Sequence, residues 1–186
     1  MVENYNEVLY DNEVLETKRL ILRRFIKNDA SDILEYASDL ETTKYLDWSG
    51  VETKDEALKG IYNYYWSKPG IFAIELAETK KCIGAIDLRL IPEHEKASFG
   101  YVLNRKYWNK GYMTEALSAL LRLCFEKLEL NRVESQHYVG NEGSGKVMSK
   151  CGMELEGIGI QETLTKGTFR DTVHYGLTKK HWLQGL

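Results

Sequence analysis

The spacing of apolar residues changes along the chain between the two-residue period of a strand and the longer period of a helix. Phe72, Ile74 and Leu76 alternate with their neighbours, which is typical of a strand. From Met113 to Leu128, apolar residues recur every three or four positions and so share one helix face. The patterns together predict strands at 17–26, 72–76, 83–90, 98–103, 132–139, 153–163 and 168–178, and helices at 55–66, 113–128 and 145–151, with a further helix that begins after Asn28 or Asp29 and runs through Ala37.

Capping residues and the order of the elements define the expected domain. Thr53 and Glu56 have the spacing of a capping box at the start of the helix at 55–66. Because several strands precede the long helix, the order favours an α+β domain with a mixed sheet over a doubly wound parallel sheet. We therefore expect residues 1–16 to form a peripheral N-terminal extension and residues 17–186 to form a single domain.

The composition fits an ordinary soluble domain and excludes several classes of protein. The 186 residues carry 25 basic and 28 acidic side chains, a net charge of −3, whereas a protein that mainly binds nucleic acid usually has a basic excess. No apolar run approaches the roughly 20 residues that span a bilayer. The first residues lack the pattern of a secretory signal, and the three cysteines are an odd number without close pairing. We expect a cytoplasmic protein whose partners include neither membrane nor nucleic acid.

A short basic and aromatic loop joins the strand at 98–103 to the long helix. The first amides of a helix have no partner within the helix and lie at the positive end of its dipole. Lys110 adds a full positive charge at this point, and Gly111 leaves room for a ligand to approach the backbone. The junction is therefore a candidate anion site of the kind that holds a pyrophosphate. An ordinary strand–helix connection with a Gly and a Lys is the alternative.

The sequence Trp-Asn-Lys-Gly-Tyr-Met-Thr-Glu-Ala, residues 108–116, resembles the coenzyme A loop of the GNAT N-acetyltransferases. It is most similar to the branch named for the RimJ and RimL ribosomal-protein acetyltransferases. In this family the loop follows Arg/Gln-x-x-Gly-x-Gly/Ala, and its amides hold the pyrophosphate of acetyl-CoA. Trp108 replaces the usual Arg or Gln, as is common in this branch, and Met113 replaces the more usual Gly or Ala. The resemblance implies acetyl-CoA as cosubstrate.

A second motif lies between the strand at 132–139 and the short helix that follows it. Gly140, Gly145 and Lys146 have the spacing of a phosphate-binding Walker A loop, but Val147 stands where that loop needs a Ser or Thr to bind Mg²⁺. Nucleotide hydrolysis is therefore the weakest alternative. The same stretch resembles the second GNAT signature, Asn-x-x-Ser followed by a basic residue and Gly-Phe/Met-x-x-Glu-Gly, which is present as Asn141, Ser144, Lys146, Gly152, Met153, Glu156 and Gly157.

The resemblance covers residues 17–180 and implies the GNAT acyl-CoA N-acyltransferase fold, a mixed and mostly antiparallel sheet flanked by helices. The strands at 98–103 and 132–139 are then expected to splay apart and hold the acetyl-pantetheine arm between them. A bulge near Val102 or Leu103 would present an amide that stabilises the oxyanion. The implied cofactor-binding residues are Tyr101, Val102, Leu103, Asn109, Lys110, Gly111, Tyr112, Met113, Thr114, Asn141, Ser144 and Lys146.

Acetyl transfer to an amine needs a neutral amine, a polarised carbonyl and a proton for the leaving thiolate. Ser144 is the candidate proton donor, with Asn141 beside it, although a helix cap explains Ser144 equally well. Ser98 stands where many relatives have a Glu, and Asp87 is the candidate catalytic carboxylate in its place. A solvated Asp near an edge or a turn is the alternative for Asp87. The other candidate bases are His137, His174 and a chain of water molecules.

Aromatic residues concentrate around the two early helices, at Tyr45, Trp48, Tyr62, Tyr64, Tyr65 and Trp66. They fit either core packing or the wall of an acceptor pocket, to which an acidic neighbour such as Asp47 would attract a cationic amine. The four histidines lack metal-ligand spacing, so we expect no metal.

The resemblance implies an N-acetyltransferase that moves the acetyl group of acetyl-CoA to a primary amine by direct attack in a ternary complex. The acceptor is either a protein N-terminal α-amine or a small amine. A non-catalytic module that binds or senses coenzyme A on the same fold is the alternative. Because homodimers are common among relatives, a homodimer is a further expectation.

Overall fold

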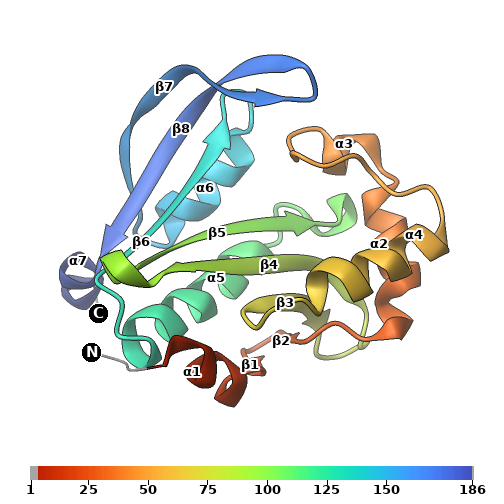
Figure 1. Ribbon diagram of the computed structural model, residues 1–186, viewed down its shortest axis with the longest axis horizontal. Coiled ribbons are helices and arrows are strands. Elements are labelled where there is room, and N and C mark those ends of the chain that lie inside the picture. Colours follow the sequence, from red (N-terminus) through yellow and green to blue (C-terminus); the bar gives the residue numbers. More distant parts are fainter. Residues whose placement is uncertain (1–3, 186) are drawn as a thin grey trace.

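The computed structural model describes residues 4–185 of the chain. Its strands are β1 (Leu15–Glu16), β2 (Leu20–Arg23), β3 (Ile71–Leu76), β4 (Cys82–Ile91), β5 (Lys96–Leu103), β6 (Arg132–Tyr138), β7 (Glu154–Thr165) and β8 (Thr168–Thr178). They form one sheet in the order β1-β2-β3-β4-β5-β6-β8-β7 (Figure 1). The pair β5–β6 is parallel and the other neighbours are antiparallel. The expected α+β class with a mixed, mostly antiparallel sheet is confirmed.

Helices cover both faces of this sheet. They are α1 (Tyr5–Asp11), α2 (Ala30–Ala37), α3 (Leu40–Thr43), α4 (Lys54–Gly60), α5 (Tyr112–Arg122), α6 (Glu142–Lys150) and α7 (Lys179–Gln184). Single π-helical turns at Ile61–Tyr65 and Leu123–Lys127 extend α4 and α5, and short 3₁₀ turns lie at Lys27–Asp29, Pro92–His94 and Arg105–Tyr107. Among residues 4–185, no helix combines the length and the apolar character needed to cross a membrane.

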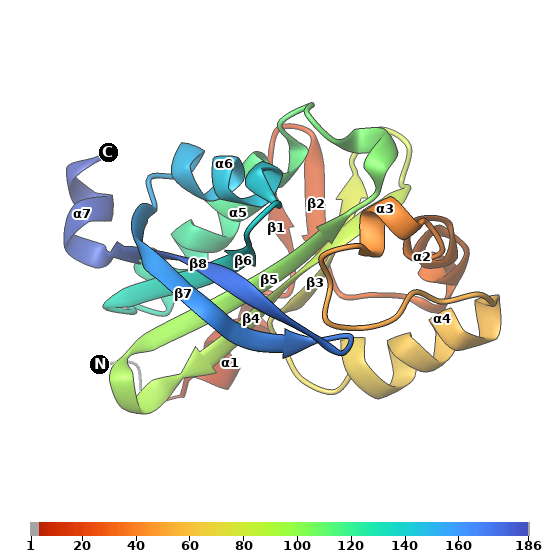
Figure 2. The ribbon, with the colours of Figure 1, turned by 90° about the horizontal axis from the view of Figure 1, so that it is seen from above.

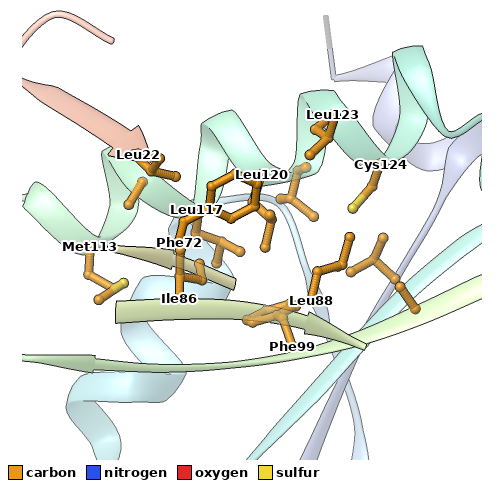
Figure 3. Packing of buried hydrophobic residues seen from close by; sticks show 14 of the residues in the cluster. Leu22, Phe72, Ile86, Leu88, Phe99, Met113, Leu117, Leu120, Leu123 and Cys124 are labelled. Atoms are coloured by element: carbon orange, nitrogen blue, oxygen red, sulfur yellow. The ribbon is translucent and has the colours of Figure 1, made fainter. Parts of the chain in front are cut away.

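The helix α5 packs its apolar stripe on one face of the sheet. Leu117 and Leu120 lie over Ile86, Leu88 and Phe99 (Figure 3), and all five side chains are buried. Each fully buried Leu or Ile contributes about 1.5–3 kcal/mol of transfer free energy. This packing fixes the start of α5, where the candidate anion site lies.

A second apolar cluster covers the opposite face, under α2 and α4. Ile33 and Ala57 come from these helices, and Ala85 and Val102 come from β4 and β5. Figure 2 shows α2, α3 and α4 gathered beside the same part of the sheet. Because alternate residues of a strand point to opposite faces, Ala85 faces this cluster while its neighbour Ile86 faces α5.

The strands β5 and β6 separate after a short paired region. Their pairing covers Lys96–Ser98 with Arg132–Glu134, and the hydroxyl of Ser135 then donates a hydrogen bond to the carbonyl of Phe99 at 2.8 Å. Beyond this point the two strands diverge toward their carboxyl ends (Figure 1). The expected splay is present. The expected bulge is not, because β4 and β5 pair without a register shift from Gly84↔Leu103 to Ile91↔Lys96.

Other differences from the predicted elements lie at element ends. The helix expected at 145–151 begins at Glu142, because Asn141 occupies the N-cap position. Three short helices, α1, α3 and α7, were not predicted. In α1, Leu9 is buried in the core, and β1 pairs with β2. The division between an extension at 1–16 and a domain at 17–186 stays a prediction, and residues 1–3 and 186 lie outside the described part of the chain.

Candidate active site

A cleft of about 840 Å³ passes through the gap between β5 and β6. On the α2–α4 side it is lined by Tyr64, Asp87 and Arg89. On the α6 side it is lined by Asn141 and Ser144. The cleft is therefore lined by side chains from both faces of the sheet.

The loop before α5 has a backbone conformation that exposes the first amides of the helix. Asn109 and Gly111 both have positive φ, at 58° and 78°, and Gly111 is the N-cap of α5 without a side-chain hydrogen bond to the first turn. The indole nitrogen of Trp108 donates to the carbonyl of Leu103 at 2.7 Å and so ties the loop to the end of β5. The amides of the first turn lack a side-chain cap from Gly111 and lie at the positive end of the helix dipole.

The remaining loop residues contribute in different ways. The Lys110 ammonium folds back and donates to the carbonyl of Lys106 at 2.9 Å. Met113 is buried in the core, and the carbonyl of Thr114 accepts from the thiol of Cys151. For Met113 the side chain thus serves packing, and only its backbone is available to a ligand. Lys146 lies on α6 beside a separate, smaller hollow and not in the main cleft.

The Ser144 side chain forms a hydrogen bond with Tyr101 and does not cap α6. The two hydroxyl oxygens lie 2.8 Å apart, and the hydroxyl of Tyr101 is also 3.1 Å from the carbonyl oxygen of Ser144. Ser144 is the third residue of α6, after the N-cap Asn141, whose side chain makes no capping hydrogen bond. Burial raises the pKa of Tyr101 and outweighs the opposing hydrogen bond with Ser144. Tyr101 therefore keeps its proton across the physiological pH range, and its hydroxyl is a hydrogen-bond donor.

Asp87 lies on the central strand β4, so a solvated position at an edge or turn is wrong for this residue. Its side chain is buried, with an exposed fraction of 8% for the whole residue. It accepts hydrogen bonds from Arg89 at 2.7 and 3.1 Å, from the Tyr64 hydroxyl at 3.0 Å and from the Gly100 amide at 3.0 Å. A Cβ on Gly100 would lie 2.4 Å from the guanidinium of Arg89, so only glycine leaves room for this cluster.

The other two candidate bases occupy different places. His137 lines the cleft, and its Nδ1 lies 2.9 Å from the carbonyl oxygen of Tyr138. When Nδ1 donates this hydrogen bond, Nε2 is the acceptor nitrogen of the ring. The Nε2 atom of His174 lies 2.6 Å from a carboxylate oxygen of Glu162 on the β7–β8 hairpin, and His174 does not line the cleft.

The aromatic residues divide between the two roles that the sequence left open. Tyr45, Trp48 and Tyr64 line the cleft. Tyr65 also reaches the cleft but stacks on Phe25 at 3.9 Å between ring centroids, as part of the second core cluster. The cleft wall and the core are thus built from the same run of aromatic residues.

Arg89 is a cleft residue that sequence reasoning missed. It follows Asp87 by two positions, so both side chains point to the same face of β4. This period was visible in the sequence, but the other two donors to Asp87, the Tyr64 hydroxyl and the Gly100 amide, come from segments distant in the chain. No local pattern connects these segments.

The structure combines a mixed sheet, two splayed parallel strands and a cleft at the splay. Residues 19–154 match the family model described as "Acetyltransferase (GNAT) domain". The chain belongs to this family, and it is an N-acetyltransferase of the kind that uses acetyl-CoA.

Similar proteins support the assignment over almost the whole chain. An uncharacterized N-acetyltransferase of Bacillus subtilis, YoaA, is 33% identical and covers 89% of this chain and 97% of its own length. The [ribosomal protein uS5]-alanine N-acetyltransferase of Escherichia coli is 26% identical over 92% of this chain and 93% of its own. The crystal structure of a GNAT-family acetyltransferase from Bacillus anthracis superimposes with a TM-score of 0.82 at 27% identity, over 90% of this chain and 99% of that one. The expected RimJ/RimL-like resemblance is confirmed.

Proposed function

We propose that this enzyme transfers the acetyl group from acetyl-CoA to a protein N-terminal α-amine or a small primary amine, by direct attack in a ternary complex. One observation carries the proposal: the cleft at the splay of β5 and β6 is lined by residues from both faces of the sheet. The thioester enters from the side of α5 and α6, and the amine enters from the side of α2 and α4. Their reacting atoms meet between the strands.

On the coenzyme A side, the amides of residues 109–114 bind the diphosphate. The positive φ of Asn109 and Gly111 and the dipole of α5 support this assignment. The pantetheine arm then passes along Tyr101, Val102 and Leu103, whose strand is free of a partner on the β6 side beyond the paired region. The side chain of Asn141, which makes no capping hydrogen bond to α6, contributes its amide group at the same opening.

Ser144 and Tyr101 protonate the leaving thiolate. The hydroxyl groups of the two residues lie within hydrogen-bond distance of each other and line the cleft. A proton that leaves one hydroxyl is replaced by the proton of the other, and a proton from solvent then restores the pair, so the two act as one donor. No covalent acetyl-enzyme is needed, because Cys82 and Cys124 are buried away from the cleft and burial raises the pKa of both thiols.

On the acceptor side, Asp87 organises the amine site. Both of its carboxylate oxygens already accept hydrogen bonds, so it holds the Tyr64 hydroxyl and the Arg89 guanidinium at the cleft wall. His137 or a chain of water molecules removes the amine proton. We further propose a cytoplasmic location and, as among many relatives, a homodimer.

The test measures release of free thiol from acetyl-CoA with a panel of amines: peptides with N-terminal Ala or Ser, a polyamine and an aminoglycoside. We expect one class to be acetylated. In Ser144→Ala, kcat with that acceptor should fall by about 10²-fold, the low end for a lost general acid. Ser149→Ala, an exposed serine on the same helix, is the control and should stay within twofold. Tight binding of coenzyme A without thiol release for any amine would instead identify a sensing module.

A further inference from the structure

Arg19 reaches across the molecule to the loop that precedes α5. It lies between β1 and β2, and its carbonyl is fixed by the amide of Ala77 at 3.0 Å. Its guanidinium donates from Nε to Glu115 at 2.6 Å and from an Nη atom to the carbonyl of Lys110 at 3.0 Å. The same group lies over the ring of Tyr112, 4.3 Å from the ring centroid. One side chain thus contacts three residues of the loop and the first helical turn.

Glu115 receives further hydrogen bonds from the same segment. Its Oε1 accepts from the Thr17 hydroxyl and from the backbone amide of Arg19, both at 2.7 Å. Although burial alone would raise the pKa of Glu115, these hydrogen bonds and the charge of Arg19 lower it overall. The carboxylate is therefore ionised and fully engaged by residues 17–19.

A carboxylate in the first turn of α5 has an electrostatic consequence. It is attracted to the positive end of the helix dipole, and it repels any other anion bound there. Arg19 supplies the compensating charge at 2.6 Å. Without Arg19, Glu115 would oppose a diphosphate at the same helix start.

We propose that Arg19 is a positioning residue for coenzyme A, which holds the loop at 109–112 in its anion-binding conformation and neutralises Glu115. This inference rests on the proposed function, because it concerns the diphosphate site of acetyl-CoA. Arg19 acts through the loop and not on the reacting atoms. Its loss should therefore weaken coenzyme A binding and raise the KM for acetyl-CoA while kcat at saturation changes little.

The test compares the affinity for coenzyme A, measured by titration calorimetry, among matched variants. We expect Arg19→Ala to raise Kd by about tenfold, the effect of losing one charge-assisted contact of about 1.4 kcal/mol. Arg19→Lys keeps the charge but not the two-pronged donor geometry, so its Kd should rise by about threefold. Arg24→Ala is the control: Arg24 is equally exposed and pairs with Glu13. Its Kd should stay within twofold.

A double variant separates the electrostatic role from a merely structural one. Adding Glu115→Gln to Arg19→Ala removes the uncompensated charge, so we expect Kd to recover to within about threefold of the unchanged protein. A purely structural role predicts a further loss, since a second member of the cluster is removed. That result, or an Arg19→Ala protein that binds coenzyme A as well as the unchanged one, would overturn the inference. If the unchanged protein itself gave no heat with coenzyme A, the proposed function would fail instead.

Discussion

At the scale of single residues, the polar side chains of the cleft differ in how many hydrogen bonds they already make within the protein. Asp87 has four donors around two oxygens, whereas Ser144 shares its hydroxyl with a single neighbour, Tyr101. The hydrogen-bond-accepting positions of this carboxylate are therefore occupied. The geometry therefore favours Asp87 as an organiser of the acceptor site.

Replacing Asp87 tests this role through the pH dependence of the reaction. We expect Asp87→Asn to lower kcat/KM for the amine by about tenfold, because Arg89 and Tyr64 lose the charge that orients them. The affinity for coenzyme A should stay within twofold, since its site lies on the other side of the sheet. The acid limb of the pH–rate profile should remain. Its disappearance, with a loss in kcat of about 10²–10⁴, would show instead that Asp87 is the general base.

The sequence located several site residues but not their partners. The motif around Asn141 and Ser144 predicted that both residues lie at the start of a helix, and in the structure they lie at the start of α6. The bond from Ser144 to Tyr101 spans 43 positions, and that from Arg19 to Glu115 spans 96. Periodicity reports only on neighbours within one element, so contacts of this range require the fold.

At the scale of elements, local rules predicted the interiors well and the ends less well. The capping box of Thr53 and Glu56 is present, with Glu56 accepting from the amide of Thr53. The stripe predicted on α5 is buried, and Arg122, a charged residue of the same helix, is exposed. The π-helical turns that extend α4 and α5 have no simple signal in the sequence.

The helix α5 carries the proposed diphosphate site on its first turn, so its packing should matter for stability and function alike. Leu120 is fully buried against the sheet, and Leu120→Ala should lower the free energy of unfolding by about 2–5 kcal/mol. For a domain of this size each kcal/mol corresponds to about 2–4 °C in Tm. Arg122→Ala, on the exposed side of the same helix, is the control for thermal denaturation. A shift in Tm no larger for Leu120→Ala than for the control would show that the helix is not held by this stripe.

At the scale of the whole molecule, the cleft exists because the sheet opens between β5 and β6. Contacts between distant segments form the border of this cleft on the side of α2 and α4. The Tyr45 hydroxyl donates to the carbonyl of Gly140 at 2.7 Å, and the ammonium of Lys166 donates to the carbonyl of Thr43 at 3.0 Å. The segment around α3 is thereby bridged to the start of α6 and to the β7–β8 hairpin, as their positions in Figure 1 suggest.

Glu35 also connects distant segments, beside the loop that precedes α5. It accepts from Lys106 and from Lys81, both at 2.8 Å, and so joins α2 to the loop after β5 and to the residue before β4. Lys106, followed by Lys81, lowers the pKa of Glu35 from 4.5 to about 2, against a small opposing effect of burial. Because the pKa is lower in the folded state, Glu35 stabilises the fold above about pH 4.5 and loses this contribution as the pH falls toward 2.

Replacing Glu35 should therefore change stability in a way that depends on pH. At pH 7, Glu35→Gln should lower the free energy of unfolding by about 1 kcal/mol, a value that allows for solvent screening of a partly exposed group. The difference from the unchanged protein should shrink below pH 4.5 and be small near pH 2, where Glu35 is about half protonated in the folded state. Denaturant unfolding at a series of pH values measures it. Glu78→Gln, in the exposed turn between β3 and β4, should differ by less than about 0.5 kcal/mol throughout. A Glu35→Gln deficit that stays constant from pH 7 to pH 3 would show that the ion pairs do not join these segments, and that packing alone fixes α2 against the loop.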